Sequence, residues 1–160
     1  MTIKVGDAIP SVKLKRLGAN GMEEIDTRDA FAGKKAVLFS VPGAFTPTCS
    51  AKHLPGFVDH AQAIRDKGVD VVYCTAVNDP FVMKAWGEQA GVADKVEMLP
   101  DGNGEFVTAL GLEMDGTGFG LGKRGQRFAL IAEDGKVTVL SVEEPGAFEV
   151  SSAEAVLAAL

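Results

Sequence analysis

Two short apolar runs, separated by a segment with helical spacing, constrain the fold of this chain more than any other feature. The runs are residues 36–41 and 69–75, and each suits a strand that is covered on both faces. Apolar residues in the segment between them, 46–65, recur with the period of a helix. A strand, a helix and a second strand in this order predict a βαβ unit with parallel pairing and a right-handed crossover.

The rest of the chain predicts further elements around this unit. Strands are expected at residues 12–16, 95–99, 127–132 and 136–142, and helices at 26–31, 78–90, 104–110 and 152–160. Asp134 and Gly135, between the last two strands, are a hairpin signal. The chain has 160 residues and no internal repeat, which suits one domain over residues 1–160. Periodicity alone permits an α/β sheet of thioredoxin-like or of flavodoxin-like type.

The helix that follows the first apolar run places a cysteine in its first turn. Thr46 is a plausible N-cap, and Pro47 then takes the first helical position, where a missing N–H costs nothing. Cys49 would lie among the unpaired N–H groups at the positive end of the helix dipole, which favours the reactive thiolate. Pro55 predicts a kink or break near Leu54, after which the helix resumes.

The eight residues from Pro42 to Cys49, Pro-Gly-Ala-Phe-Thr-Pro-Thr-Cys, resemble the Pro-x-x-x-Thr-x-x-Cys motif of peroxiredoxins, in the wording of the peroxiredoxin-5 or type II branch. Further similar segments are Lys52-His53-Leu54-Pro55-Gly56-Phe57, Val77-Asn78-Asp79, Trp86-Gly87 and Arg127-Phe128. The resemblance implies a thioredoxin-like α/β fold with a central mixed sheet flanked by helices. It also implies a thiol-dependent peroxidase that reduces hydrogen peroxide and organic hydroperoxides. Thr48 departs from the pattern, since many relatives have glycine before the cysteine.

The resemblance also implies a role for each residue of the site. Cys49 would attack the peroxide and become a sulfenic acid, while Pro42 shields the sulfur from water. Enriching the thiolate by about 30-fold contributes only about 2 kcal/mol, so other groups must stabilise the charge on the leaving oxygen. Thr46 and Arg127 are expected to do this. Arg124 is the rival for the arginine role, but Arg127 immediately precedes Phe128 as in the family.

Cys74 has two interpretations that stay open. It lies in the second apolar run, 25 residues after Cys49, where core packing is the ordinary explanation. Some type II relatives have a cysteine at this spacing that is proposed to resolve the sulfenic acid. Relatives that resolve with a cysteine near the C-terminus have it at positions equivalent to Val150 and Ser151, which are not cysteines here. Direct attack of a reductant thiol on Cys49 is favoured, because a cysteine in a strand needs local unfolding to reach disulfide distance.

Two other features have weaker functional interpretations. His53 lies one helical turn after Cys49, but a metal site needs more ligands than this pair, so His53 is expected near the pocket mouth. The glycine-rich stretch 116–122 lacks the strand and the Lys-Ser/Thr ending of a phosphate-binding loop, so a flexible loop is expected, with Phe119 near the active site and the subunit contact. Trp86 and Phe81 are expected to pack.

The net charge and the family resemblance limit which partners are expected. A net charge of −6 without a long basic run argues against nucleic acid and anionic membranes. The N-terminal segment lacks the features of a signal peptide, so a cytoplasmic location is expected. The resemblance implies no cofactor, a homodimer, and glutaredoxin with glutathione, or thioredoxin, as the reductant. A thiol–disulfide oxidoreductase would need Cys-x-x-Cys, which this chain lacks, whereas a non-enzymatic redox sensor using Cys49 stays open.

Overall fold

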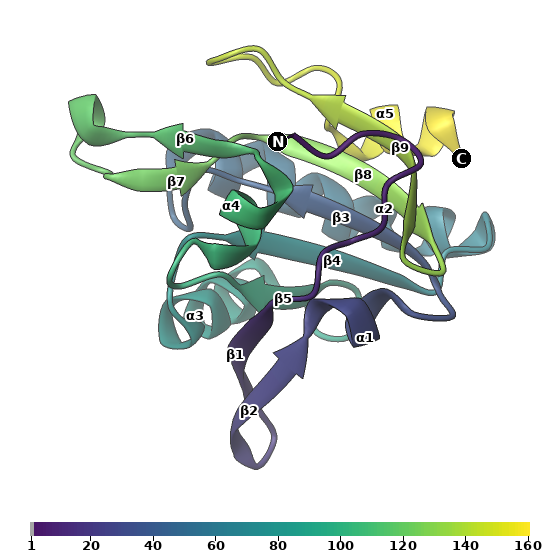
Figure 1. The fold of residues 1–160 in the computed structure, drawn as a ribbon, viewed down its shortest axis with the longest axis horizontal. Helices are drawn as coiled ribbons and strands as arrows, with labels where there is room; N and C mark the ends of the chain where they lie inside the picture. Colours follow the sequence, from purple (N-terminus) through teal and green to yellow (C-terminus); the bar gives the residue numbers. More distant parts are fainter. Residues whose placement is uncertain (1) are drawn as a thin grey trace.

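A five-stranded mixed sheet forms the centre of the computed structural model, which describes residues 2–160 (Figure 1). Its strands, in spatial order, are β5 Glu97–Pro100, β4 Val71–Ala76, β3 Lys35–Ser40, β8 Phe128–Glu133 and β9 Lys136–Val142. β3, β4 and β5 are parallel, whereas β8 runs antiparallel to both β3 and β9. The expected βαβ unit is confirmed, and the antiparallel strands agree with a thioredoxin-like rather than a flavodoxin-like sheet.

Both faces of the sheet are covered, which explains why the β3 segment is apolar without alternation. Val37 and Phe39 point into one hydrophobic cluster, while Ala36 and Leu38 point into the other. The first cluster lies under α2 Leu54–Asp66, α3 Pro80–Ala90 and α5 Ala153–Ala159. The second lies under α1 Thr27–Phe31 and α4 Glu105–Leu110.

Side-chain caps begin three of the helices, and the predicted turn between the last two strands of the chain is present. Asp26, Asp79 and Ser152 each cap the helix that follows by accepting a backbone N–H. Asp134 and Gly135 both have positive φ, at 49° and 76°, as a two-residue hairpin between β8 and β9 requires. The predicted hairpin is confirmed because its turn needs positive φ, which only a few residue types adopt readily.

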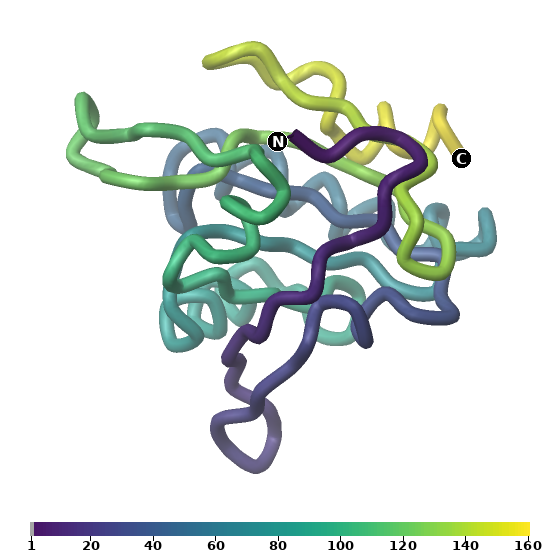
Figure 2. The backbone as a smooth tube through the Cα atoms, viewed as in Figure 1, coloured from purple at the N-terminus to yellow at the C-terminus, as the bar shows by residue number. Residues whose placement is uncertain are grey.

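Two hairpins project from the body of the protein, and the sequence indicated neither in full (Figure 2). β1 Lys13–Gly18 pairs with β2 Gly21–Asp26, whose exposed and half-buried residues show no apolar alternation. β6 Glu113–Asp115 pairs with β7 Lys123–Gly125, and a 3₁₀ turn, Thr117–Phe119, joins them. Residues 116–122 therefore form a loop, as expected, but one that contains this turn and connects two paired strands. Among residues 2–160, no helix is long and apolar enough to cross a membrane.

Candidate active site

The helix that carries Cys49 begins with a wide turn. Helical structure begins at Pro47, and Cys49–His53 forms a π-helix in which the N–H of Leu54 donates to the carbonyl of Cys49. The α-helix then runs unbroken from Leu54 through Pro55. Of the kink or break expected near Leu54, the break is wrong: the helix continues but changes from π to α at Leu54, which places Pro55 in the first turn of the α-helix, where proline is tolerated.

Hydrogen bonds fix the loop between β3 and Cys49. The hydroxyl of Thr46 donates to the carbonyl oxygen of Gly43 at 2.7 Å, so the structure does not show the capping bond expected of Thr46. The N–H of Ala44 donates to Oδ1 of Asn78 at 2.9 Å, which ties the loop to the end of β4. Phe45 has a φ of 64°, the left-handed region that non-glycine residues seldom adopt, and its ring is half exposed. The loop is thus held in a specific, strained conformation.

Arg127, immediately before β8, reaches the sulfur of Cys49 across 78 positions of the chain. One terminal nitrogen donates to Cys49 Sγ at 3.1 Å, and the other lies 2.8 Å from Nδ1 of His53. Arg124 instead donates to the carbonyls of Leu121 and Pro42 and has no hydrogen bond to the thiol. Of the two arginines that the sequence offered, the structure therefore brings Arg127 to Cys49.

His53 is buried and neutral, not at the pocket mouth as expected. Burial and the neighbouring Arg127 charge lower the pKa of His53 to about 3. Its Nε2 lies 2.9 Å from the carbonyl of Ser151, so Nε2 carries the proton, and Nδ1 accepts the hydrogen bond from Arg127. Three aromatic rings surround the imidazole, those of Phe39, Phe57 and Phe148. The sequence carried no signal for this partnership of His53 with Arg127.

A cavity of about 550 Å³ opens beside the Cys49 helix and contains Pro42, Thr48 and Arg127 in its lining. The β6–β7 arm contributes the apolar side chains Met114 and Phe119 to this lining, which also contains the acidic residues Glu113, Asp115, Glu143 and Glu144. Cys49 itself is fully buried. A small molecule in this cavity would therefore approach the thiol past Thr48 and Arg127.

Cys74 lies in the interior of β4 and is also fully buried, with its thiol free like that of Cys49. It pairs with Phe39 of β3 on one side and Met98 of β5 on the other. Burial, together with the nearby Cys49, raises the pKa of the Cys74 thiol well above its usual value. Cys74 is therefore held as a neutral thiol in the middle of the sheet.

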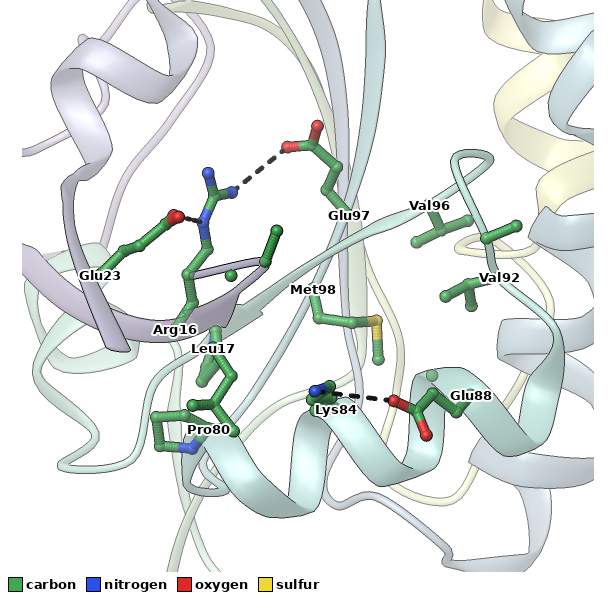
Figure 3. A pocket seen from close by; sticks show the side chains of 15 residues that line it. Arg16, Leu17, Glu23, Pro80, Lys84, Glu88, Val92, Val96, Glu97 and Met98 are labelled. Carbon is green, nitrogen blue, oxygen red and sulfur yellow. Dashed lines mark hydrogen bonds and ion pairs between the residues drawn. The ribbon is translucent and has the colours of Figure 1, made fainter. Parts of the chain in front are cut away.

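Other parts of the described chain offer less chemistry. A second cavity of about 440 Å³ lies between the β1–β2 hairpin and α3 (Figure 3), where Arg16 pairs with Glu97 and Lys84 pairs with Glu88. It contains no nucleophilic thiol. Within residues 2–160, no three His, Cys, Asp or Glu side chains are grouped so that they could hold a metal ion.

Trp86 packs as expected and donates to Ser50 Oγ, whereas Phe81 is exposed, so its expected packing is wrong.

Comparison of the sequence with known proteins identifies a family whose members use a thiol, which agrees with the contact between Cys49 and Arg127. The Redoxin family matches residues 4–157. The chain is 49% identical to peroxiredoxin-2B of Arabidopsis thaliana, with 99% of this chain and 98% of that protein covered. The chain belongs to the peroxiredoxins, in their type II branch. This peroxiredoxin is also 50% identical to chloroplastic peroxiredoxin-2E of the same plant, covering 99% of the chain and 70% of the relative.

A solved relative gives the same fold. Reduced Prx3 from Vibrio vulnificus, crystallised in complex with hydrogen peroxide, superposes with a TM-score of 0.95 at 52% identity, and 99% of each chain is covered. The thioredoxin-like fold expected from the sequence is confirmed. As a peroxiredoxin, the protein is a thiol-dependent peroxidase that reduces peroxides, which confirms the activity expected from the sequence.

Proposed function

We propose that Cys49 is the residue that attacks the peroxide and that Arg127 activates it. The observation that carries this proposal is the 3.1 Å hydrogen bond from the Arg127 guanidinium to Cys49 Sγ. A fixed positive charge beside the sulfur favours the thiolate, which is the nucleophilic form. The thiolate attacks one peroxide oxygen, so that an S–O bond forms while the O–O bond breaks. Sulfur is oxidised to a sulfenic acid, and the leaving oxygen takes up a proton to become water or an alcohol.

Donors around the sulfur would stabilise the leaving oxygen as negative charge builds on it. Arg127 is one donor. The Thr46 hydroxyl, whose proton is bonded to the Gly43 carbonyl in the structure, is proposed to turn toward the leaving oxygen when the peroxide binds and to act as another. Each donor of this kind contributes on the order of 10²- to 10³-fold to a rate. Pro42 lines the cavity and carries no side-chain donor, so its proposed role is to keep water from the sulfur.

The substrates proposed are hydrogen peroxide and small organic hydroperoxides. The relative from Vibrio vulnificus was crystallised with hydrogen peroxide, and its high similarity supports the same substrate here. The cavity of about 550 Å³ also has room for a larger group beside the apolar side chains of Met114 and Phe119. An organic hydroperoxide would place its carbon chain against these side chains while its terminal oxygen meets the thiol.

An external thiol is the proposed reductant, and Cys74 has a packing role. The Cys74 thiol is fully buried in the middle of the sheet, and its raised pKa keeps it protonated, which makes it a poor nucleophile. An external thiol would attack the sulfenic sulfur of Cys49, releasing water and forming a mixed disulfide. A second thiol would then release the Cys49 thiolate and leave as part of a disulfide. Glutaredoxin with glutathione, or thioredoxin, supplies thiols of this class.

A homodimer formed at the active-site end is proposed from exposed aromatic side chains. Phe119, at the tip of the β6–β7 arm, is 86% exposed and also lines the cavity. Phe45, in the loop before Cys49, is 48% exposed. Rings exposed to this extent beside an active site favour contact with a second copy of the chain.

Peroxide turnover by three proteins tests the assignment. Wild type, Cys49→Ser and Arg127→Gln are each assayed with glutathione plus glutaredoxin, and separately with thioredoxin plus its reductase. We expect no turnover for Cys49→Ser and at least about 100-fold slower reaction for Arg127→Gln. Free thiols are counted after one equivalent of peroxide. Retention of the Cys74 thiol supports the one-cysteine cycle, and loss of both thiols in a monomer would contradict it. Oxidation of Cys49 without turnover by either reductant would favour the redox sensor instead.

A further inference from the structure

The loop that joins β9 to α5, residues 143–151, folds back over the partners of Cys49. The ring of Phe148 lies 5.8 Å from the guanidinium carbon of Arg127, and its centroid lies 4.9 Å from that of the His53 ring. At the end of the loop, the carbonyl of Ser151 accepts the hydrogen bond from His53. The loop therefore contacts both side chains that form a hydrogen-bonded series leading to the sulfur.

One buried carboxylate holds this loop in place. Oε2 of Glu143 accepts hydrogen bonds from the N–H of Glu149 at 2.8 Å, the N–H of Ser151 at 2.8 Å and the hydroxyl of Ser151 at 2.7 Å. The N–H of Glu143 itself donates to the carbonyl of Arg127 at 3.0 Å. Glu143 is only 7% exposed and lies at the wall of the cavity of about 550 Å³, so these loop donors are the partners that the structure gives its carboxylate.

The charge state of Glu143 agrees with this arrangement. Burial alone would raise its pKa, but hydrogen bonds from the Ser151 side chain and from the loop backbone outweigh burial, and the net shift is downward. The carboxylate is therefore ionised at neutral pH. Hydrogen bonds to an ionised acceptor are roughly twice as strong as neutral ones.

We propose that Glu143 is a positioning residue for Arg127 in the peroxidase reaction, acting through the loop at 143–151. The series runs from the Glu143 carboxylate to Ser151, from the Ser151 carbonyl to His53, and from His53 to the guanidinium that holds the Cys49 sulfur. This inference rests on the proposed role of Arg127. Glu143 has no hydrogen bond to the Arg127 side chain or to Cys49. Besides the loop, it has two direct links to this series: its N–H donates to the Arg127 carbonyl, and its charge raises the pKa of His53 against the larger effect of burial.

Removing the carboxylate would leave three donors in the loop without their acceptor. The loop would rearrange so that these donors can form hydrogen bonds with water, and the Ser151 carbonyl would move away from His53. The imidazole and then the guanidinium would lose their fixed orientation. A misplacement of about 1 Å at a reacting group costs on the order of 100-fold in rate. The loss would fall mainly on the peroxide step, because that step needs the guanidinium in one position as the O–O bond breaks.

Matched substitutions in the loop test the proposal. Glu143→Ala removes the acceptor, and Glu143→Gln keeps one acceptor oxygen but removes the charge. Glu149→Gln makes the same chemical change at an exposed side chain of the same loop, while its N–H to Glu143 is retained. Two rates are measured for each protein by mass spectrometry. One is the oxidation of Cys49 by hydrogen peroxide, and the other is the alkylation of Cys49 by iodoacetamide.

We expect Glu143→Ala to slow the peroxide reaction by about 10- to 100-fold and the alkylation by much less. Glu143→Gln should slow the peroxide reaction by about threefold, and Glu149→Gln should match the wild type. If circular dichroism shows that Glu143→Ala does not fold, the comparison of Glu143→Gln with Glu149→Gln provides the same test. A peroxide rate unchanged by the substitutions at Glu143 would overturn the proposal.

A double-mutant cycle with Arg127→Gln identifies the route. If Glu143 acts through Arg127, adding Glu143→Ala to Arg127→Gln should slow the peroxide reaction by no more than about twofold further. Additive losses would show that Glu143 acts by another route and would overturn the inference. Wild-type reactivity of Arg127→Gln alone would refute the role of Arg127. The two failures are therefore distinguishable.

Discussion

Lowering the pH from 7 to 5 should weaken the folded state by about 2 kcal/mol through His53 alone. In the folded protein, burial and the Arg127 charge lower the pKa of His53 from 6.5 to about 3. The unfolded chain takes up a proton at this residue as the pH falls below 6.5, whereas the folded chain does not. The free energy of unfolding is therefore unaffected by His53 well above pH 6.5, and it decreases progressively as the pH falls from 6.5 toward 3.

The magnitude follows from the size of the shift. Each pKa unit corresponds to about 1.4 kcal/mol, so the full difference between about 3 and 6.5 is on the order of 5 kcal/mol at pH 3. At pH 5 only the first 1.5 units contribute, which gives about 2 kcal/mol. The pKa of Glu143 is shifted below its ordinary value of 4.5, so this carboxylate titrates mainly below the window from pH 7 to 5.

Urea unfolding at pH 7, 6 and 5 measures this loss in wild type, His53→Gln and His60→Gln. His60→Gln is the matched control at the other histidine of the chain, a partly exposed position on α2, and should retain the loss that His53 causes. His53→Gln should be less stable at pH 7, since it alters the hydrogen bonds to Arg127 and Ser151, but its stability should change by less than about 0.5 kcal/mol over the same range. An equal loss in wild type and His53→Gln would refute the assignment of the acid sensitivity to His53.

Two further substitutions test the helix that carries Cys49. Thr46→Val should slow the reaction with hydrogen peroxide by about 100-fold, because the hydroxyl is proposed to act on the leaving oxygen. The rate of Cys49 alkylation by iodoacetamide should stay within a few-fold of the wild-type rate. Equal losses in both reactions would instead show a disturbed loop. Pro55→Ala should change the free energy of unfolding by less than about 1 kcal/mol, since Pro55 occupies the first turn of α2. A gain approaching about 3 kcal/mol in urea unfolding would mean that Pro55 strains a helix interior.

The sequence predicted those elements whose signals are local. The apolar runs of β3 and β4 indicate strands buried on both faces, and the structure confirms them. Asp79 before Pro80 marks the start of α3 for a similarly local reason, because a side-chain acceptor and a fixed φ suit a helix N-terminus. β2, β6 and β7 were missed because exposed or three-residue strands carry little apolar pattern. Their pairing depends on the partner strand and not on their own residues.

The same distinction applies to the active site. The motif around Cys49 identified the thiol and the family, and similarity to Arg127-Phe128 selected the correct one of two arginines for the contact with the sulfur. The partnership of His53 with Arg127 was missed because it joins positions 74 apart in the chain. The loop at 143–151 was missed too, since the value of Glu143 depends on the backbone groups that surround it. No periodicity or spacing encodes such contacts.

The π-turn explains how a single arginine serves both Cys49 and His53. The two residues are four positions apart, so they lie close together at the start of the helix, and one presents a sulfur while the other presents an imidazole nitrogen. A guanidinium is a rigid planar fork, and Arg127 uses one terminal nitrogen for each acceptor. A lysine has a single nitrogen at the end of a flexible chain and would not hold both acceptors with the same geometry. The neutral state of His53 is therefore part of the design of the site, because a protonated imidazole would repel the guanidinium that the sulfur needs.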